Sequence, residues 1–267
     1  GDGLEESYPQ FGPLIPSFGP LIHSFGFPQR EASLAGCCFG ISTRKDIGMK
    51  SEWLALVLSY VYVFAAIGIG EGLRKWQGYS TDFTRKFIHI TVGMWSVGTV
   101  LLFENWYFAV IPPLSFVIIN YISHRRETFK AMEVGEKGNL GTVYFPISFS
   151  LIICCLWARR HLVVASLMPM TWGDALAAIL GRHYGQYQYS IRGFTRSLEG
   201  SLTMFIFSWL ATFLALLFFP PLGWQLSLLY SLIVAVIATA VEAVSIWHVD
   251  NLTVPFFSAL LLYLLAR

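Results

Sequence analysis

Residues 170–182 read Met-Thr-Trp-Gly-Asp-Ala-Leu-Ala-Ala-Ile-Leu-Gly-Arg and have the composition of the end of a membrane helix. An aspartate, Asp174, stands inside this apolar run. A carboxylate in a bilayer costs about 2.5–3.5 kcal/mol on insertion scales, so it usually faces a partner, an ion or a wet cavity. Gly173, Ala177 and Gly181 recur every four residues, a spacing that lets a second backbone come close. The stretch therefore predicts a tightly packed membrane helix that carries a functional carboxylate.

Arginines and a second carboxylate follow this helix. Arg182, Arg192 and Arg196 precede Glu199 in the sequence. A guanidinium can hold phosphate through two parallel hydrogen bonds, and carboxylate oxygens are ligands that Mg²⁺ accepts. The combination predicts phosphate chemistry at a membrane surface.

The composition of the chain places this stretch in a polytopic membrane protein. The 267 residues are 55% hydrophobic and 13% charged, with a mean hydropathy of +0.58. Apolar runs of about 20 residues, long enough to cross a bilayer as a helix, recur along the chain. We therefore expect an all-α fold, a polytopic transmembrane helical bundle of about eight segments. These segments are 53–73, 87–103, 105–122, 142–158, 161–181, 201–219, 226–246 and 252–266. Pro112 and Pro113 are expected to kink the third segment.

The first part of the chain differs from the rest. The run Phe-Gly-Pro-Leu-Ile occurs at 11–15 and again at 18–22. Proline and glycine at this density exclude a regular helix. We expect residues 1–48 to be a disordered or presequence-like tail and residues 49–267 to form the membrane-embedded domain.

Basic residues cluster in alternate connections between the predicted segments. The connections after the first, third and fifth segments carry 11 of the 18 Lys and Arg residues, and those after the second and sixth carry none. The positive-inside rule places the basic connections in the cytoplasm, or in the stroma of a plastid. The polar clusters of the chain then fall on or near this one face.

Four polar residues near the start of the second segment share one helix face. Asp82, Arg85, Lys86 and His89 lie at positions i, i+3, i+4 and i+7. Arg85 could grip a phosphate with two hydrogen bonds while Lys86 adds a point charge. The alternative is a positive stop signal beside a membrane helix, which needs neither Asp82 nor His89.

Glycines and polar side chains also precede the fourth segment. Gly138, Asn139, Gly141 and Thr142 could form an anion-binding nest of backbone N–H groups at the start of a helix. The alternative is an ordinary turn with a helix cap.

A last polar cluster joins the seventh and eighth segments. Glu242 and Ser245 are three residues apart and share a helix face that leads to Asp250 and Asn251. Asp and Asn oxygens are hard ligands suited to Mg²⁺. The alternative for Asp250 is an N-cap of the last helix.

Five short motifs follow one another along the chain. They are Arg-Lys-x-x-His at 85–89, Gly-Thr-Val-Tyr-Phe-Pro at 141–146, Gly-Asp-Ala-x-Ala-x-x-x-Gly-Arg at 173–182, Ser-x-Glu-Gly-Ser at 197–201 and Asp-Asn-Leu-Thr-Val-Pro at 250–255. In this order they resemble the CTP-dependent polyprenol kinase family, and the second and last look most like its phytol kinase branch, beside which stand the farnesol kinases. The resemblance covers about residues 50–267. Arg196 stands where a lysine is expected, and His248 where a glycine is expected.

The resemblance implies transfer of the γ-phosphate of CTP to the hydroxyl of a prenyl alcohol such as phytol. The product would be phytyl phosphate, which feeds tocopherol synthesis or the salvage of phytol from chlorophyll. The implied partners are the alcohol, a nucleoside triphosphate and the lipid bilayer, with Mg²⁺ as cofactor. A cyanobacterial or plastid membrane is the implied location, with the active face cytoplasmic or stromal. No nucleic-acid partner is expected, and the oligomeric state stays open.

In and beside these motifs we assign roles to individual residues from the chemistry of their side chains. The expected catalytic residues are Asp174, Arg85 and Lys86, and Asp174 would bind Mg²⁺ or orient the hydroxyl. The expected nucleotide-binding residues are Arg85, Lys86, Asn139, Gly141, Gly181, Arg182, Arg196, Ser197 and Gly200. The expected metal ligands are Asp174, Glu199 and Asp250.

Three alternatives remain from the sequence. A phosphatidate cytidylyltransferase would share lipid, CTP and metal but release pyrophosphate, and another polyprenol kinase would use farnesol or dolichol. A transporter would use Asp174 and Glu242 as ion-coupling groups, although the chain has no inverted repeat.

Five aromatic residues are candidates for contacts with the hydrocarbon chain of the alcohol. Trp95, Trp106, Tyr107, Trp157 and Trp209 could line a tunnel for the alcohol. The alternative is an interfacial aromatic belt, which is the commoner use of such residues.

Overall fold

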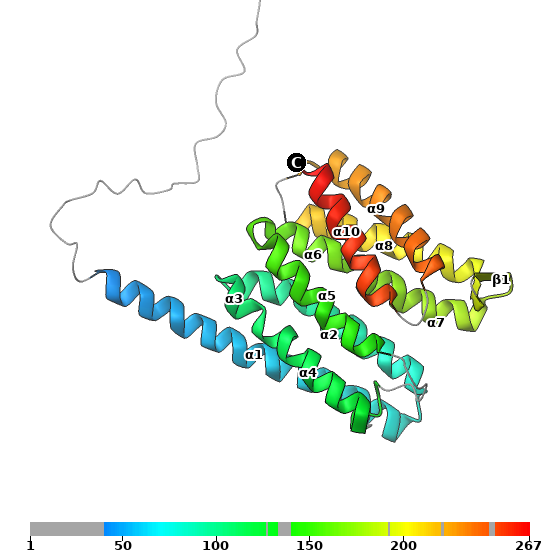
Figure 1. Cartoon of the computed structure of the whole chain (residues 1–267), viewed down its shortest axis with the longest axis horizontal. Helices are drawn as coiled ribbons and strands as arrows, with labels where there is room; N and C mark the ends of the chain where they lie inside the picture. Colours follow the sequence, from blue (N-terminus) through cyan, green and yellow to red (C-terminus); the bar gives the residue numbers. More distant parts are fainter. Residues whose placement is uncertain (1–39, 127, 133–139, 192, 220–221, 246–248) are drawn as a thin grey trace, which may run out of the picture. The chain divides into compact units, whose positions relative to one another are not determined.

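Helices make up almost all of the chain that the structure describes (Figure 1). The computed structural model describes residues 40–126, 128–132, 140–191, 193–219, 222–245 and 249–267, with residues 43–267 in one unit. The elements are α1 (Gly40–Gln77), α2 (Thr81–Leu102), α3 (Trp106–Ala109), α4 (Ile111–Arg126), α5 (Gly141–Leu156), η1 (Trp157–Arg159), α6 (Arg160–Met168), η2 (Pro169–Asp174), α7 (Ala175–Tyr184), β1 (Gln188–Ile191), β2 (Phe194–Ser197), α8 (Leu198–Phe218), α9 (Trp224–Val244) and α10 (Asp250–Leu265). Residues 1–39 of the expected tail lie outside the described residues, and residues 40–48 belong to α1.

The all-α, polytopic membrane fold predicted from the sequence is confirmed. Each of the eight predicted segments coincides with a helix or a run of consecutive helices. Within the described residues, five stretches are long and apolar enough to cross a membrane: Ser51–Gln77, Trp106–Arg126, Gly141–Tyr184, Leu198–Phe218 and Trp224–Val244. The fourth and fifth predicted segments are joined in one of these stretches, because α5, η1, α6, η2 and α7 follow one another without a loop. Helix α10 is apolar but shorter, and α2 is more polar because Arg85, Lys86 and His89 lie in its first turns.

The third predicted segment is divided into two helices just before Pro112 and Pro113. The short helix α3 ends at Ala109, and α4 starts at Ile111 with Pro112 and Pro113 in its first turn. A proline costs little there, because the first N–H groups of a helix have no partner inside the helix. The predicted kink is therefore a change of helix at Val110.

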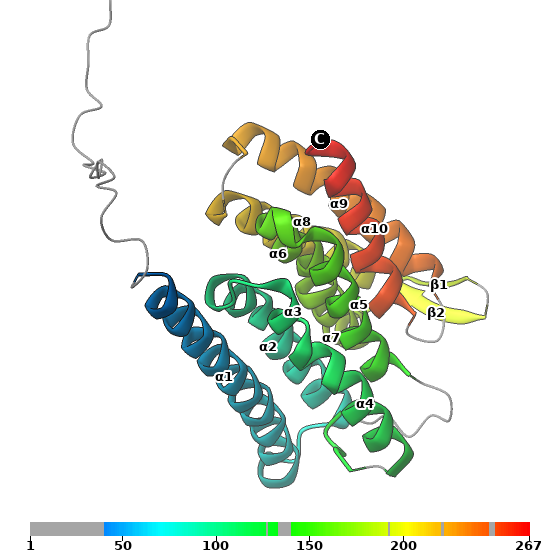
Figure 2. The same ribbon diagram turned by 60° about the vertical axis from the view of Figure 1, so that its left-hand side comes forward.

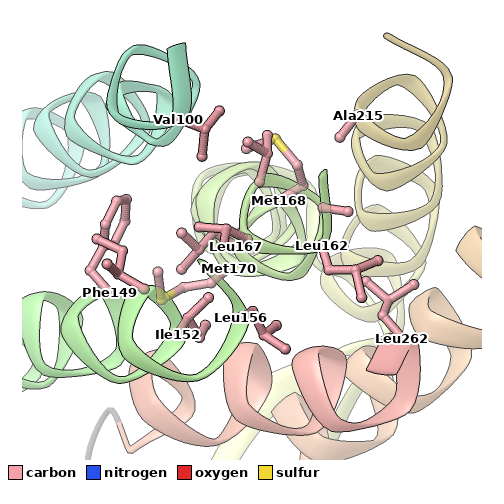
Figure 3. Packing of buried hydrophobic residues seen from close by; sticks show 14 of the residues in the cluster. Val100, Phe149, Ile152, Leu156, Leu162, Leu167, Met168, Met170, Ala215 and Leu262 are labelled. Atoms are coloured by element: carbon pink, nitrogen blue, oxygen red, sulfur yellow. The ribbon is translucent and has the colours of Figure 1, made fainter. Parts of the chain in front are cut away.

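Helix α6 lies at the centre of the core. Its residues 162–168 are all buried, whereas the neighbouring helices each expose one side. A helix that is apolar on every face has to be surrounded by others. Figure 3 shows side chains from α2, α5, α8 and α10 gathered around it, among them Val100, Phe149, Ala215 and Leu262. The helix that follows α6 is thereby fixed in position, and that helix carries Asp174.

The turn between α6 and α7 is π-helical. Pro169 has no N–H group to donate, and the helix widens from this residue to Asp174. Single π-helical turns often mark functional sites, because the widened ladder re-aims the side chains of the turn. Here the widened turn ends at the carboxylate that the sequence singled out.

Two glycines allow α8 to approach this turn and α7 closely. A Cβ atom on Gly173 would collide with Ser208 Oγ and Met204 Sδ of α8. A Cβ atom on Gly181 would lie 3.1 Å from the Cα atom of Gly200. The close packing predicted from the small residues at 173, 177 and 181 is therefore made against α8.

A two-stranded antiparallel hairpin joins α7 to α8 (Figure 2). Strand β1 pairs with β2 so that Gln188 lies opposite Ser197 and Tyr189 opposite Arg196. Gly193 has a φ of +82°, a left-handed conformation that glycine adopts readily at such a turn. The hairpin was not predicted, and it carries Arg196 to the ends of α9 and α10.

Candidate active site

Asp174 forms a buried ion pair with Lys86 of α2. The Nζ atom of Lys86 donates to Oδ2 of Asp174 over 2.5 Å, and the two residues are only 6% and 7% exposed. They are 88 positions apart in the sequence and belong to different motifs. A buried lysine held by a carboxylate of another helix does not have the surroundings of a charge that only flanks a membrane helix.

His89 lies one turn after Lys86 and joins the same group. Its Nε2 atom is 2.9 Å from the carbonyl oxygen of Met170 and 3.8 Å from Oδ2 of Asp174. Met170 belongs to the π-helical turn, so the contact links α2 to the backbone that positions Asp174. Lys86 and His89, predicted to share a face, therefore both face Asp174.

Asp82 and Arg182 form a second pair at the end of α7. Their ion pair joins the first turn of α2 to the last turn of α7. Both side chains are about half exposed, and exposed pairs contribute little to stability. Arg182 thus contacts Asp82, whereas Asp174 contacts Lys86.

Arg196 connects the hairpin to the last two helices. It forms an ion pair with Glu242 of α9, donates from Nη2 to the carbonyl oxygen of Ser245 over 2.9 Å, and approaches Asp250 Oδ2 at 3.8 Å. A guanidinium can serve several partners at once, which a lysine ammonium with its single centre does less well. The arginine found in place of the expected lysine suits this position.

The acidic and amide pair at 250 and 251 is buried at the start of α10. Asp250 is the first residue of the helix and not its cap, which is Val249, so the N-cap alternative is wrong. The Nδ2 atom of Asn251 donates to the carbonyl oxygen of Gly141 over 3.0 Å. The Oδ1 atom of Asn251 is buried, with no hydrogen-bond partner among the described residues.

One polar cavity collects most of the predicted residues. It has a volume of about 600 Å³ and lies between the ends of α2, α7, α9 and α10, the hairpin and the start of α8. Of the predicted site residues, Arg85, Lys86, Asp174, Gly181, Arg182, Arg196, Ser197, Gly200 and Asp250 line it. Glu242, which contacts Arg196, lines it as well.

Two of the other three predicted residues lie elsewhere, and the third is outside the described residues. Glu199 is not among the residues that line the cavity, and its carboxylate accepts the backbone N–H of Tyr187 at 3.2 and 3.4 Å. Gly141 lines a neighbouring apolar pocket, and Gly138 of the nest predicted around it lies outside the described residues. Asn139 lies outside the described residues.

The apolar pocket meets the polar cavity at two basic side chains. It has a volume of about 100 Å³ and is lined by residues of α1, α2, α4, α5 and α10. Arg85 and Lys86 line both hollows. Of the five aromatic residues considered for an alcohol tunnel, Trp95 lines this pocket and the other four do not.

The start of α8 adds a further feature of the cavity. Ser197 caps this helix, and its Oγ atom accepts the N–H of Gly200 at 3.1 Å. Ser197, Gly200 and Ser201 all line the cavity. A helix N-terminus carries a partial positive charge and attracts anions.

The cavity's carboxylates suit a Mg²⁺ ion that substrate phosphates also hold. Asp174, Glu242 and Asp250 line the cavity, and their oxygens are hard ligands. Among the described residues, no three His, Cys, Asp or Glu side chains converge on one point. Mg²⁺ is commonly bound through one or two carboxylates and the phosphates of a substrate, which needs no complete protein cage.

The pairing of Arg196 with Glu242 was not predicted from the sequence. Glu242 was noted in the sequence, but its pairing with Arg196 depends on the hairpin. The signal for the hairpin was present, because two short runs rich in Tyr, Ile, Thr and Phe flank the Arg-Gly dipeptide at 192–193.

Named relatives of the chain are prenyl alcohol kinases. It is 30% identical to a phytol kinase of Synechocystis over 217 residues, covering 78% of this chain and 90% of that protein. It is 28% identical to phytol kinase 1, chloroplastic, of Arabidopsis thaliana, covering 79% and 72% of the two chains. A farnesol kinase, chloroplastic, of the same plant is 23% identical over 254 residues, covering 88% and 81%.

No protein-family model and no solved structure matches the chain. The relatives nevertheless match over most of their own length. The chain belongs to the phytol and farnesol kinase branch of the polyprenol kinase family.

Proposed function

We propose that the chain is a membrane-embedded kinase that transfers the γ-phosphate of CTP to the hydroxyl of a prenyl alcohol such as phytol. The observation that carries this proposal is that Arg85 and Lys86 line both a polar cavity and an apolar pocket. A kinase of this kind has to bring an aqueous nucleotide to an alcohol dissolved in lipid. The names of the relatives, phytol kinase and farnesol kinase, support the same reaction.

Positively charged groups of the cavity would hold the triphosphate. Arg85 makes no ion pair with any residue in the described part of the chain, so its guanidinium is available to a phosphate. Lys86, Arg182 and Arg196 supply further charge, and Ser197 and Gly200 place the start of α8 against the cavity. Gly141 and Asn139 are retained as nucleotide contacts on the resemblance alone. Phosphoryl transfer needs mainly positioning and neutralisation of charge, which these groups offer.

Asp174 and Asp250 are the residues that would hold Mg²⁺. Both line the cavity, whereas Glu199 lies outside its lining and already accepts a backbone hydrogen bond. The geometry therefore favours the two aspartates over Glu199. When bound, Mg²⁺ supplies positive charge to the phosphate oxygens and orients them.

The transfer itself exchanges one phosphorus–oxygen bond for another. The alcohol oxygen bonds to the γ-phosphorus. The bond between the γ-phosphorus and the oxygen that it shares with the β-phosphate breaks, and the nucleoside diphosphate leaves. The hydroxyl proton would pass to the carboxylate of Asp174, or to a phosphate oxygen if Asp174 is a metal ligand. Asp174 would orient the hydroxyl if it is not a metal ligand, and Lys86 holds its carboxylate in place at 2.5 Å.

The choice of CTP and the membrane setting complete the proposal. No described side chain is assigned to the cytosine base, so CTP rests on the family resemblance. The relatives come from a cyanobacterium and from chloroplasts, which supports a cyanobacterial or plastid membrane. From the positive-inside rule we expect the cavity on the cytoplasmic or stromal face.

Radiolabelled CTP tests the proposal directly. Purified wild-type protein is incubated with Mg²⁺ and phytol, farnesol, dolichol, diacylglycerol or phosphatidate. We expect label from the γ-phosphate, and none from the α-phosphate, in the phosphate of a prenyl alcohol. Label from the α-phosphate in lipid would identify a cytidylyltransferase, and no label in any lipid would favour a transporter. Either result would overturn the proposal.

A further inference from the structure

The apolar pocket has one polar end. Asn251 donates to the carbonyl oxygen of Gly141, and Asn120 donates from Nδ2 to the carbonyl oxygen of Thr142 over 2.8 Å. Lys86 lines the pocket and contacts Asp174 of the polar cavity. These contacts place the starts of α5 and α10 and the later part of α4 beside the charged groups.

The other end of the pocket is apolar and lies deep along α2. Lys86 and Thr99 both line it and are thirteen residues apart on this helix, about 20 Å at 1.5 Å per residue. No residue of the lining after His89 on α2 is charged. The apolar and aromatic lining residues include Val92, Trp95, Phe116, Phe145 and Phe149.

Polar atoms at the deep end are already bonded within the protein. Trp95 donates from Nε1 to Ser59 Oγ over 3.0 Å, and Thr99 donates from Oγ1 to the carbonyl oxygen of Trp95 over 2.9 Å. A hydrocarbon buried against these residues therefore leaves no donor unsatisfied. The deep end suits an alkyl chain and offers nothing to a polar ligand.

Trp95 is held firmly in the wall. Its ring stacks on Tyr62 with the ring centroids 4.5 Å apart, and Tyr62 donates from its hydroxyl to the carbonyl oxygen of Thr91 over 2.9 Å. The indole is thus fixed by two residues of α1, Tyr62 at its face and Ser59 at its nitrogen. A wall that is fixed in this way can limit the length of the ligand that the pocket accepts.

We propose that this pocket binds the isoprenoid chain of the alcohol, with the hydroxyl at Lys86, and that Trp95 and Thr99 set the chain length that it accepts. The inference rests on the proposed function, which supplies the alcohol. The lining follows α2 for about 20 Å from Lys86 to Thr99, so a longer chain reaches the deep wall and a shorter one stops before it. Phytol has four isoprene units and farnesol three, so the chain of phytol extends further toward Trp95 and Thr99.

Substitution of Thr99 tests the depth of the pocket. The hydroxyl of Thr99 donates only to its own helix, so replacing it breaks no hydrogen bond between helices. We expect Thr99→Leu to lower the ratio of kcat/KM for phytol over farnesol on the order of tenfold, because one methylene in an apolar site is worth about that. Thr99→Ala is expected to raise the same ratio. Leu101→Phe, at a residue of α2 that is 66% exposed, is the matched control and leaves the ratio unchanged.

An equal loss for both alcohols in Thr99→Leu, or an unchanged ratio in both Thr99 variants, would overturn the chain-length assignment. Each protein is first shown to be monodisperse in detergent with the thermal midpoint of the wild type.

Photolabelling gives a second readout that does not depend on turnover. A farnesol analogue with a diazirine at the end remote from its hydroxyl is irradiated with the full-length wild-type protein. We expect label on α2 and α5 near Trp95 and Phe149, and competition by phytol. Label on α8 or α9, at the groove lined by Phe205 and Val236, would refute the pocket assignment. Correct labelling without phosphorylation of any alcohol would leave the pocket standing and refute the proposed kinase.

Discussion

The ion pair between Lys86 and Asp174 makes a quantitative prediction about stability. The Nζ and Oδ2 atoms are 2.5 Å apart, and both side chains are less than a tenth exposed. Removing one partner of a buried pair leaves an uncompensated charge and costs about 3–5 kcal/mol. Because the pair borders a polar cavity that can admit water, we expect the lower end of this range for Lys86→Met and for Asp174→Asn.

The double variant separates pairing from individual effects. Lys86→Met combined with Asp174→Asn leaves no unpaired charge, so its loss of unfolding free energy should be smaller than the sum of the single losses by about 1–3 kcal/mol. The assay is reversible unfolding of detergent-purified protein, followed by circular dichroism. Asp82→Asn and Arg182→Met form the matched control cycle at a half-exposed pair, where each loss should stay below about 1 kcal/mol. Additive losses for Lys86 and Asp174 would refute the reasoning.

Three further predictions follow from packing, topology and the resemblance. Gly173→Ala should lower the unfolding free energy by about 1–3 kcal/mol, because its Cβ meets Ser208, and adding Ser208→Ala should recover part of the loss. A loss that Ser208→Ala does not reduce would contradict the packing account. Single cysteine reporters at 130 and 190, in a chain without its native cysteines, should react from the same side of the membrane, and one at 222 from the other. Reaction of 222 together with 190 would overturn the map of eight segments. CTP should support transfer to phytol better than ATP in a steady-state assay, and an ATP preference would remove the assignment of CTP alone.

The helices could be predicted because each depends mainly on the composition of its own stretch of sequence. An apolar run of about 20 residues specifies a membrane helix whatever its neighbours are. The paired prolines at 112 and 113 likewise marked a break, and the structure places it at Val110. Gly173 and Gly181 predicted that another helix comes close. They did not predict that this helix is α8.

The site could be predicted only as a set of separate clusters. Nothing local in the sequence says that Lys86 will contact Asp174 and that Asp82 will contact Arg182, because these pairs depend on how α2 packs against α7. The contact of Arg196 with the start of α10 likewise depends on the hairpin. The apolar pocket is built from side chains of helices distant in sequence, so no single motif announces it.

The central claim is that Asp174 takes part in phosphoryl transfer. The measurement that tests it most directly is γ-phosphate transfer per mole of monodisperse protein, for wild type and Asp174→Asn, across a titration of Mg²⁺. Asn keeps the shape of the side chain and removes its charge, so loss of a ligand or base should lower turnover on the order of 10²-fold or more while the protein still inserts. Turnover close to that of the wild type at every Mg²⁺ concentration would contradict the account.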